Sequence, residues 1–116
     1  MPDEKRYNGW TNYETWCVSL WLGNDEGLYE TVGKMASDVC YEITDAAYEW
    51  QTLSDARVAE LAEQIASFVD EVAEQTCPGC REGASFVSDL LGAALSEVNW
   101  REIAENRLGE WQEAHG

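Results

Sequence analysis

The sequence predicts an all-α fold, a compact single-domain bundle of about five helices, and three observations indicate it. Apolar residues recur every three or four positions through most of the chain, which is the spacing of one helix face. Helix-start patterns precede several of these stretches. No stretch alternates apolar and polar residues as a half-buried strand does. We expect one acidic helical domain over residues 1–116, with residues 1–9 and 114–116 flexible.

The first expected helix is rich in aromatic residues, and we expect it to anchor the core. Thr11 and Glu14 have the spacing of a capping box, in which each side chain bonds the backbone N–H of the other residue. Gly23 is expected to end this helix and Asn24 to cap the next one. The face expected to be buried consists of Tyr13, Trp16, Cys17, Leu20 and Trp21.

A second helix is expected from near Asp25, with a break at Thr44 and Asp45 because both residue types favour helix ends over helix interiors. One uninterrupted helix to about Gln51 also fits the pattern. Its apolar positions are Leu28, Val32, Met35, Val39, Ile43, Ala46 and Trp50.

The third expected helix begins at Ser54 as its N-cap, with Leu53 and Val58 as a hydrophobic staple. The Cys-Pro-Gly-Cys stretch at 77–80 ends it, because proline and glycine do not continue a helix well. Its buried stripe is Val58, Leu61, Ile65, Phe68, Val69 and Val72. Its opposite, solvated stripe is Glu60, Glu63, Ser67, Asp70, Glu71 and Glu74.

A fourth helix is expected from about Gly83 to Leu95, and its low charge predicts burial on most sides. The last helix begins with a second capping box, Asn99 and Glu102. Its expected inner face is Trp100, Ile103, Ala104, Arg107, Leu108 and Trp111, with the stem of Arg107 lying along the edge.

Charge is the strongest compositional feature. Twenty-three acidic residues against seven basic ones give a formal net charge of −16. Such a field repels nucleic acid and anionic membranes and attracts basic protein surfaces or cations, so we expect neither direct nucleic-acid binding nor membrane binding. Three interpretations stay open: a solvated surface in a salt-adapted or otherwise acidic lineage, a protein that occupies a basic nucleic-acid-binding groove of a partner, and metal binding by carboxylates.

The acids of the third expected helix are the first candidates for a partner-binding face. From Glu60 to Glu74 the helix spans about 21 Å. Its acids supply one charge per about 4 Å, whereas duplex DNA carries one per about 1.7 Å. Two or three acidic helices side by side are therefore needed to imitate DNA. The candidate acidic face is Glu60, Glu63, Asp70, Glu71, Glu74, Asp45 and Glu49.

Aromatic side chains are the second candidates for partner contact, because tryptophan and tyrosine are enriched in interface hot spots. Tyr7 and Trp10 precede the first helix and are the least constrained by its periodicity. Helical aromatic stripes more often belong to a core than to a ligand-binding face, which favours Tyr7 and Trp10 over the aromatic residues within helices.

Catalytic and metal chemistry finds little support in the sequence. Cys77 and Cys80 have the C-x-x-C spacing of zinc sites, but further ligands would have to come from Cys17, Cys40 or His115. We favour free thiols at a helix-ending turn, with a zinc-stabilised module as an alternative. His115 is the only histidine, which excludes Ser-His-Asp and Cys-His triads, and no glycine-rich phosphate loop is present. We therefore expect no enzyme and no cofactor.

No apolar run reaches the roughly 18 residues of a membrane span, and the polar start of the chain is not a signal peptide. The expected location is the cytoplasm, and specifically a host cell's cytoplasm if the gene belongs to a mobile element. The oligomeric state cannot be inferred from the sequence.

Three segments resemble a family of short uncharacterised proteins found mostly in phages, prophages and plasmids. The opening segment Asn-Tyr-Glu-Thr-Trp at 12–16 is the specific one, and segments 20–29 and 98–104 accompany it. The resemblance implies a single domain, but no activity or catalytic residue comes with it. Mobile-element accessory proteins of this size are often inhibitors of host defence, and several unrelated acidic ones mimic nucleic acid.

We therefore expect a non-catalytic phage or mobile-element protein that inhibits a host defence protein, such as a CRISPR effector or restriction system. Its acids would occupy a basic nucleic-acid-binding surface of that protein. The alternative is a structural or regulatory phage protein whose acidity serves solubility or salt adaptation.

Overall fold

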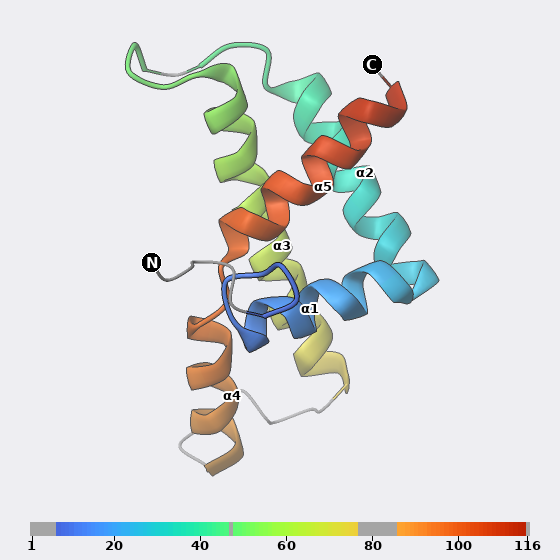
Figure 1. The fold of residues 1–116 in the computed structure, drawn as a ribbon, viewed down its shortest axis with the longest axis vertical. Helices are drawn as coiled ribbons and strands as arrows, with labels where there is room; N and C mark the ends of the chain where they lie inside the picture. The colour runs from blue at the N-terminus through green and yellow to red at the C-terminus, as the bar shows by residue number, and fades with distance from the viewer. Residues whose placement is uncertain (1–6, 47, 77–85, 116) are drawn as a thin grey trace.

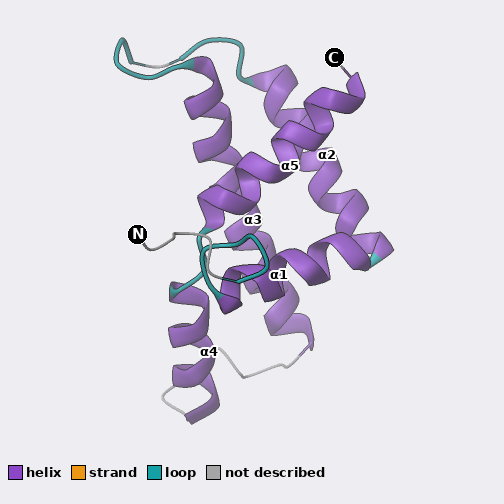
Figure 2. Ribbon diagram, in the orientation of Figure 1, coloured by secondary structure: helices purple, strands orange, loops and turns teal. Residues whose placement is uncertain are grey.

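The computed structural model describes residues 7–46, 48–76 and 86–115, and within these ranges it confirms the all-α prediction (Figure 1). The helices are α1 (Tyr13–Asn24), α2 (Glu26–Glu42), α3 (Leu53–Thr76), α4 (Phe86–Ser96) and α5 (Trp100–His115). Figure 2 shows helices joined by loops over these residues, with no strand drawn. No helix in the described ranges has the length and apolar character needed to cross a membrane.

The core lies where α3 packs against α2 and α5. Leu61 and Ile65 of α3 are completely buried, and Ile103 of α5 is 1% exposed. Their burial follows from the three-to-four-residue spacing of apolar side chains in these helices, which the sequence predicts correctly. The other buried apolar residues are Leu22, Val32, Ala36, Val39, Cys40, Val58, Val98, Ala104 and Leu108.

A tight turn precedes α1. The backbones of Tyr7 and Trp10 exchange two hydrogen bonds, N–H to C=O, of 2.9 and 2.8 Å. Asn8 and Gly9, at φ 49° and 90°, supply the two left-handed residues that such a two-residue turn requires. The turn places Trp10 against the core.

The predicted start of α1 is wrong by one residue. Asn12 is the N-cap, since its Oδ1 accepts from the Thr15 backbone N–H at 2.9 Å. The Thr11 N–H donates instead to Glu102 Oε1 at 3.0 Å, so the predicted box with Glu14 does not form. A long-range partner has replaced the local one.

The predicted buried face of α1 is also wrong. Its fully buried residues are Thr15 and Leu22, whereas Tyr13 is 52% and Trp21 63% exposed. Leu20 is 40% exposed. This helix is apolar around most of its circumference, so periodicity alone does not identify the face that meets the core. Tertiary contacts determine which face of α1 is buried.

Two further helix starts differ from the prediction by one or two residues. Asp25, and not Asn24, caps α2, because its Oδ1 accepts from the Leu28 N–H at 3.0 Å. Thr52, and not Ser54, caps α3, because its hydroxyl accepts from the N–H of Asp55 at 3.0 Å. In each case an alternative capping residue lies within two positions of the observed one, and sequence spacing does not distinguish them.

The predicted break after the second helix is confirmed, because α2 ends at Glu42. One long helix to Gln51 does not form. The carboxylate of Asp45 accepts a hydrogen bond from the Ala46 N–H at 2.9 Å, a local bond that competes with helix continuation. Trp50 lies beyond the break and is 78% exposed instead of being part of a buried stripe.

The start of α5 is joined to the start of α1 by a polar network that we call the clasp, formed by Thr11, Asn12, Thr15, Asn99 and Glu102. The buried Thr15 hydroxyl donates to Asn12 Oδ1 at 2.6 Å and accepts from the Asn99 N–H at 2.8 Å. Asn99 caps α5 as predicted, through a 3.1 Å bond from the Glu102 N–H. The Glu102 carboxylate, however, completes the clasp at Thr11.

The predicted burial of α4 is wrong. Phe86 is 79% and Leu90 59% exposed, and α4 makes few contacts with the other helices. It extends from the bundle beside the start of α5 (Figure 1). Low charge alone does not bury a helix when no other apolar face is opposite it.

Arg107 lies deeper than the edge position expected from the sequence. It is 8% exposed, its Nη2 donates to the Tyr29 C=O at 3.0 Å, and its guanidinium lies over the Tyr29 ring at 4.5 Å. The Glu110 carboxylate forms an ion pair with Arg107 Nε at 3.5 Å. Burial lowers the pKa of Arg107. This side chain therefore ties α5 to α2.

Candidate partner-binding site

The candidate site lies between α2 and α3. The two helices are in contact, Val39 and Leu61 both belong to the buried core, and Arg57 ties the C-terminal end of α2 to α3. Arg57 donates from Nε to the Ile43 C=O at 3.0 Å and from Nη2 to the Cys40 C=O at 3.1 Å. The guanidinium thus bonds carbonyls at the negative end of the α2 dipole.

A pocket of about 680 Å³ lies beside this junction. Carboxylates from three parts of the chain line it: the end of α2, the segment after α2, and α3. Its walls also include apolar and aromatic side chains. The lining residues are Glu42, Ile43, Thr44, Asp45, Tyr48, Gln51, Ala56, Ala59, Glu60 and Glu63.

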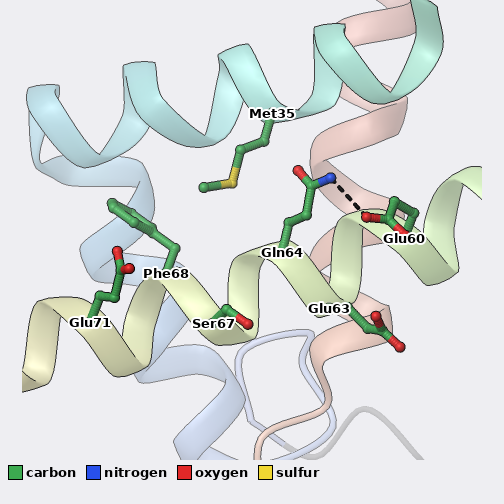
Figure 3. Close-up of a pocket in the computed structure, with 7 residues that line it drawn as sticks. All are labelled: Met35, Glu60, Glu63, Gln64, Ser67, Phe68 and Glu71. Atoms are coloured by element: carbon green, nitrogen blue, oxygen red, sulfur yellow. Dashed lines mark hydrogen bonds between the residues drawn. The ribbon is translucent and has the colours of Figure 1, made fainter. Parts of the chain in front are cut away.

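A second pocket, of about 360 Å³, follows α3 toward its C-terminal end (Figure 3). In Figure 3, Met35 points from α2 toward α3, and Phe68 rises from α3 beside it. Gln64 Nε2 donates to Glu60 Oε2 at 2.9 Å, which orients one of the carboxylates. The lining residues are Met35, Glu60, Glu63, Gln64, Ser67, Phe68 and Glu71.

Glu60 and Glu63 line both pockets, so the two form one continuous surface that we call the acidic groove. Its carboxylates are Glu42, Asp45, Glu60, Glu63 and Glu71, all of them exposed. No described lysine or arginine lines either pocket. The groove therefore concentrates negative charge over a partly apolar floor.

The described basic side chains bond partners other than the carboxylates of the groove. Lys34 pairs with Asp38 at 3.2 Å on the surface of α2. Arg101 pairs with Asp55 at 2.9 Å and with Glu105 at 3.2 Å. With Arg57 and Arg107 bound to backbone carbonyls, each basic residue in the described ranges already bonds a partner other than a groove carboxylate.

The structure brings together four of the seven acids of the predicted face. Glu60, Glu63 and Glu71 line the groove from α3, and Asp45 joins them from the segment after α2. The other three predicted acids line neither pocket: these are Glu49, Asp70 and Glu74.

The predicted aromatic pair lies apart from this groove, at the turn before α1. Tyr7 is 37% exposed and contacts Tyr13 and Trp16, with ring centroids 5.0 Å away in both cases. Trp10 is half-buried and packs against the core, which limits its use as a contact residue. A small pocket of about 280 Å³ lies beside Trp10 and Glu102.

The predicted acidic face omits Glu42, and the predicted contact residues omit a second aromatic pair, of which Tyr48 lines the groove. The rings of Tyr48 and Trp50 are stacked, with centroids 5.0 Å apart and planes within 6°. The spacing of apolar residues places Trp50 in a helix stripe that continues through residue 50. The Thr44–Asp45 helix break is the signal that separates it from that stripe.

An apolar pocket of about 490 Å³ lies between α1 and the end of α3, lined in part by Val18, Trp21 and Val72. Its one acid, Asp25, bonds the Leu28 N–H as a helix cap. This pocket therefore lacks the group of carboxylates that distinguishes the acidic groove.

The two main candidate ligands of the zinc hypothesis, Cys77 and Cys80, lie outside the described ranges. Cys40 is buried in the core and Cys17 is half-buried. Burial raises the pKa of the Cys40 thiol, and Arg57 lowers it to a smaller extent. Within residues 7–46, 48–76 and 86–115, no cluster of three or more His, Cys, Asp or Glu side chains has the arrangement of a metal site.

Comparison with known protein families places most of the chain in a family. A family model described as "Family of unknown function (DUF7249)" matches residues 3–104, which is most of the chain. No curated protein and no solved structure matches.

Proposed function

This chain belongs to the family of unknown function DUF7249, and we propose that it is a non-catalytic protein that binds a cationic surface of another protein through the acidic groove. The observation that carries this proposal is the sharing of Glu60 and Glu63 by two adjoining pockets. Because both pockets contain these two residues, side chains of α2, of α3 and of the segment between them form one negatively charged surface.

The partner we propose is a nucleic-acid-binding protein of a host defence system, such as a CRISPR effector or a restriction enzyme. Such proteins carry cationic channels for the phosphate backbone, and a negatively charged groove rim complements them. The net charge of −16 steers encounter with such a channel over distances of about a Debye length, roughly 10 Å at 0.1 M salt.

The phage and plasmid setting is part of the proposal. It is supported by the resemblance of segments 12–16, 20–29 and 98–104 to mobile-element proteins. In that setting the protein acts in the host cytoplasm and keeps the defence protein from its nucleic acid. It does so as an acidic mimic, without chemistry of its own.

A second candidate is a structural or regulatory phage protein whose acidity serves solubility. One observation favours it: acids also lie outside the groove on the other helices, for example Glu14 on α1, Asp89 on α4 and Glu113 on α5. A zinc-stabilised module is a third, and metal analysis of the purified protein tests it directly.

The test compares two variants that remove the same number of charges. The groove variant combines Glu42→Gln, Asp45→Asn, Glu60→Gln and Glu63→Gln. The control variant combines Glu26→Gln, Glu30→Gln, Asp89→Asn and Glu113→Gln, which are exposed acids outside the groove. The measurement is cleavage of a duplex substrate by a panel of CRISPR effector nucleases and restriction enzymes.

We expect the wild type and the control variant to inhibit at least one panel enzyme and the groove variant to lose inhibition. If both variants inhibit equally, the groove is not the binding site. If the wild type inhibits none of the panel, the solubility candidate is favoured.

A further inference from the structure

The Tyr48–Trp50 stack is an exposed aromatic surface at the edge of the acidic groove. Tyr48 is 57% and Trp50 78% exposed, so neither ring is needed for the core. The segment that carries them, between α2 and α3, extends past the ends of both helices (Figure 1). An exposed pair of large aromatic rings is costly to hydrate, and such pairs are typical of contact surfaces.

Tyr48 also lines the groove together with four carboxylates, Glu42, Asp45, Glu60 and Glu63. Apolar side chains complete the pocket: Ile43, Ala56 and Ala59. An occupant of this pocket therefore meets an aromatic ring, an apolar wall and several negative charges. That combination complements a long side chain with an apolar stem and a cationic end.

An arginine already binds an aromatic ring and a carboxylate at another place in this protein. The Arg107 guanidinium lies over the Tyr29 ring at 4.5 Å while Nε pairs with Glu110 at 3.5 Å. Among the described residues this is the one recorded cation over an aromatic ring. At Tyr48 the ring and the carboxylates are present, and the nearby Arg57 bonds backbone carbonyls instead.

We propose that the groove at Tyr48 takes an arginine side chain of the partner protein, with its guanidinium on the Tyr48 ring and its charge paired with the groove carboxylates. This inference rests on the proposed function, and it narrows the partner to one whose basic surface presents arginine. Trp50 stacks on one face of the Tyr48 ring and acts as a positioning residue, and the guanidinium takes the other face.

Arginine fits this pocket better than lysine for a physical reason. The guanidinium is planar, stacks on aromatic rings, and bonds carboxylates through several N–H groups at once. The lysine ammonium is more strongly hydrated and has no planar face, so it gains less from Tyr48. Charge alone attracts both, so the aromatic ring is the element that distinguishes them.

The test uses two short peptides, an arginine–serine repeat and the matching lysine–serine repeat, and measures their dissociation constants at low salt. We expect the arginine peptide to bind about three- to tenfold tighter than the lysine peptide. Tyr48→Leu should remove this preference while leaving the lysine affinity nearly unchanged. Trp50→Leu should reduce the preference to a smaller extent.

A spectroscopic measurement locates the contact. Protein labelled with 3-fluorotyrosine gives one ¹⁹F resonance per tyrosine, and loss of a resonance in Tyr48→Leu assigns that of Tyr48. We expect the arginine peptide to shift the Tyr48 resonance more than the lysine peptide does. Because both rings are exposed, the leucine variants should fold, and circular dichroism checks this.

The outcomes separate this inference from the function on which it rests. Equal affinity of the wild type for both peptides, or an arginine preference that survives Tyr48→Leu, overturns the arginine site and leaves the charge-based function standing. If the groove variant binds both peptides as tightly as the wild type does, the acidic groove is not the binding site. No binding of either peptide at low salt overturns the arginine site as well.

Discussion

The Thr15 hydroxyl accepts a hydrogen bond of 2.8 Å from the Asn99 backbone N–H, across 84 residues of sequence. This bond lies at the centre of the clasp, and it joins segment 12–16 to segment 98–104. Thr15 and Asn12 belong to the Asn-Tyr-Glu-Thr-Trp segment, and Asn99 belongs to segment 98–104. The structure thus gives these residues a role in holding the two ends of the bundle together.

The clasp should contribute measurably to stability. Thr15→Val keeps the shape of the side chain but leaves the Asn99 N–H without its acceptor, so we expect a loss of about 1–3 kcal/mol in the free energy of unfolding. Thr15→Ser keeps the hydroxyl and should lose less. Urea denaturation measures both, and a valine variant as stable as the wild type would show that the clasp contributes little.

The cap of α3 should make stability depend on pH. Hydrogen bonds from the Thr52 hydroxyl and backbone N–H, with a smaller contribution from Arg101, hold the pKa of Asp55 below its ordinary value of 3.8. A lowered folded-state pKa means that the stabilisation is present above the unfolded-state pKa and is lost as the pH falls through the folded-state pKa. Asp55→Asn should therefore be less stable than the wild type at neutral pH, and the difference should vanish in acid.

Thermal unfolding between neutral pH and pH about 2 measures that difference. Glu113→Gln, at an exposed site near the end of α5, is the matched control. If the Asp55→Asn deficit persisted unchanged in acid, the carboxylate of Asp55 would not be its source.

The helices should differ sharply in their tolerance of substitution. Ile65→Ala empties a fully buried site on α3 and should cost about 2–5 kcal/mol of unfolding free energy. Leu90→Ala alters an α4 side chain that is 59% exposed and should cost about 0.5 kcal/mol or less. A large loss at Leu90 in chemical denaturation would mean that α4 packs against the bundle in solution.

The Cys40 thiol should be protected in the folded protein. Its burial both blocks reagent access and raises its pKa, which reduces the reactive thiolate. Mass spectrometry after brief iodoacetamide treatment at pH about 8 should find Cys40 unmodified in buffer and modified in urea. Modification of Cys40 in buffer at the rate seen in urea would contradict its place in the core.

The parts of the fold that could be predicted are those with a one-sided pattern. In α3 and in most of α2, apolar residues recur on one face only, so Val32, Leu61 and Ile65 were correctly placed in the core. The α1 helix is apolar on most sides and α4 is nearly uncharged. Their sequences therefore do not indicate which helix face packs against the rest of the bundle, or whether any face does. Those two helices, together with Trp50 beyond the end of α2, account for the wrong burial predictions.

The candidate site was half predictable for a similar reason. The α3 acids share one helix face, which fixes their mutual positions, and Glu60, Glu63 and Glu71 do lie together. The contributions of Glu42 and Tyr48 depend on how the end of α2 and the segment after it lie relative to the start of α3. Arg57 of α3 ties these parts together through its bonds to the Cys40 and Ile43 carbonyls, a tertiary contact that no local pattern reveals.

The central claim is that the groove carboxylates bind a cationic surface of a partner, and the salt dependence of binding tests it most directly. The measurement is the dissociation constant of the complex with an inhibited panel nuclease at increasing NaCl concentration, for the wild type, the groove variant and the control variant. We expect the affinity of the wild type to fall steeply with salt, and the groove variant to show a shallower dependence than the control variant. An affinity that does not change with salt, or the same dependence in both variants, would contradict the account.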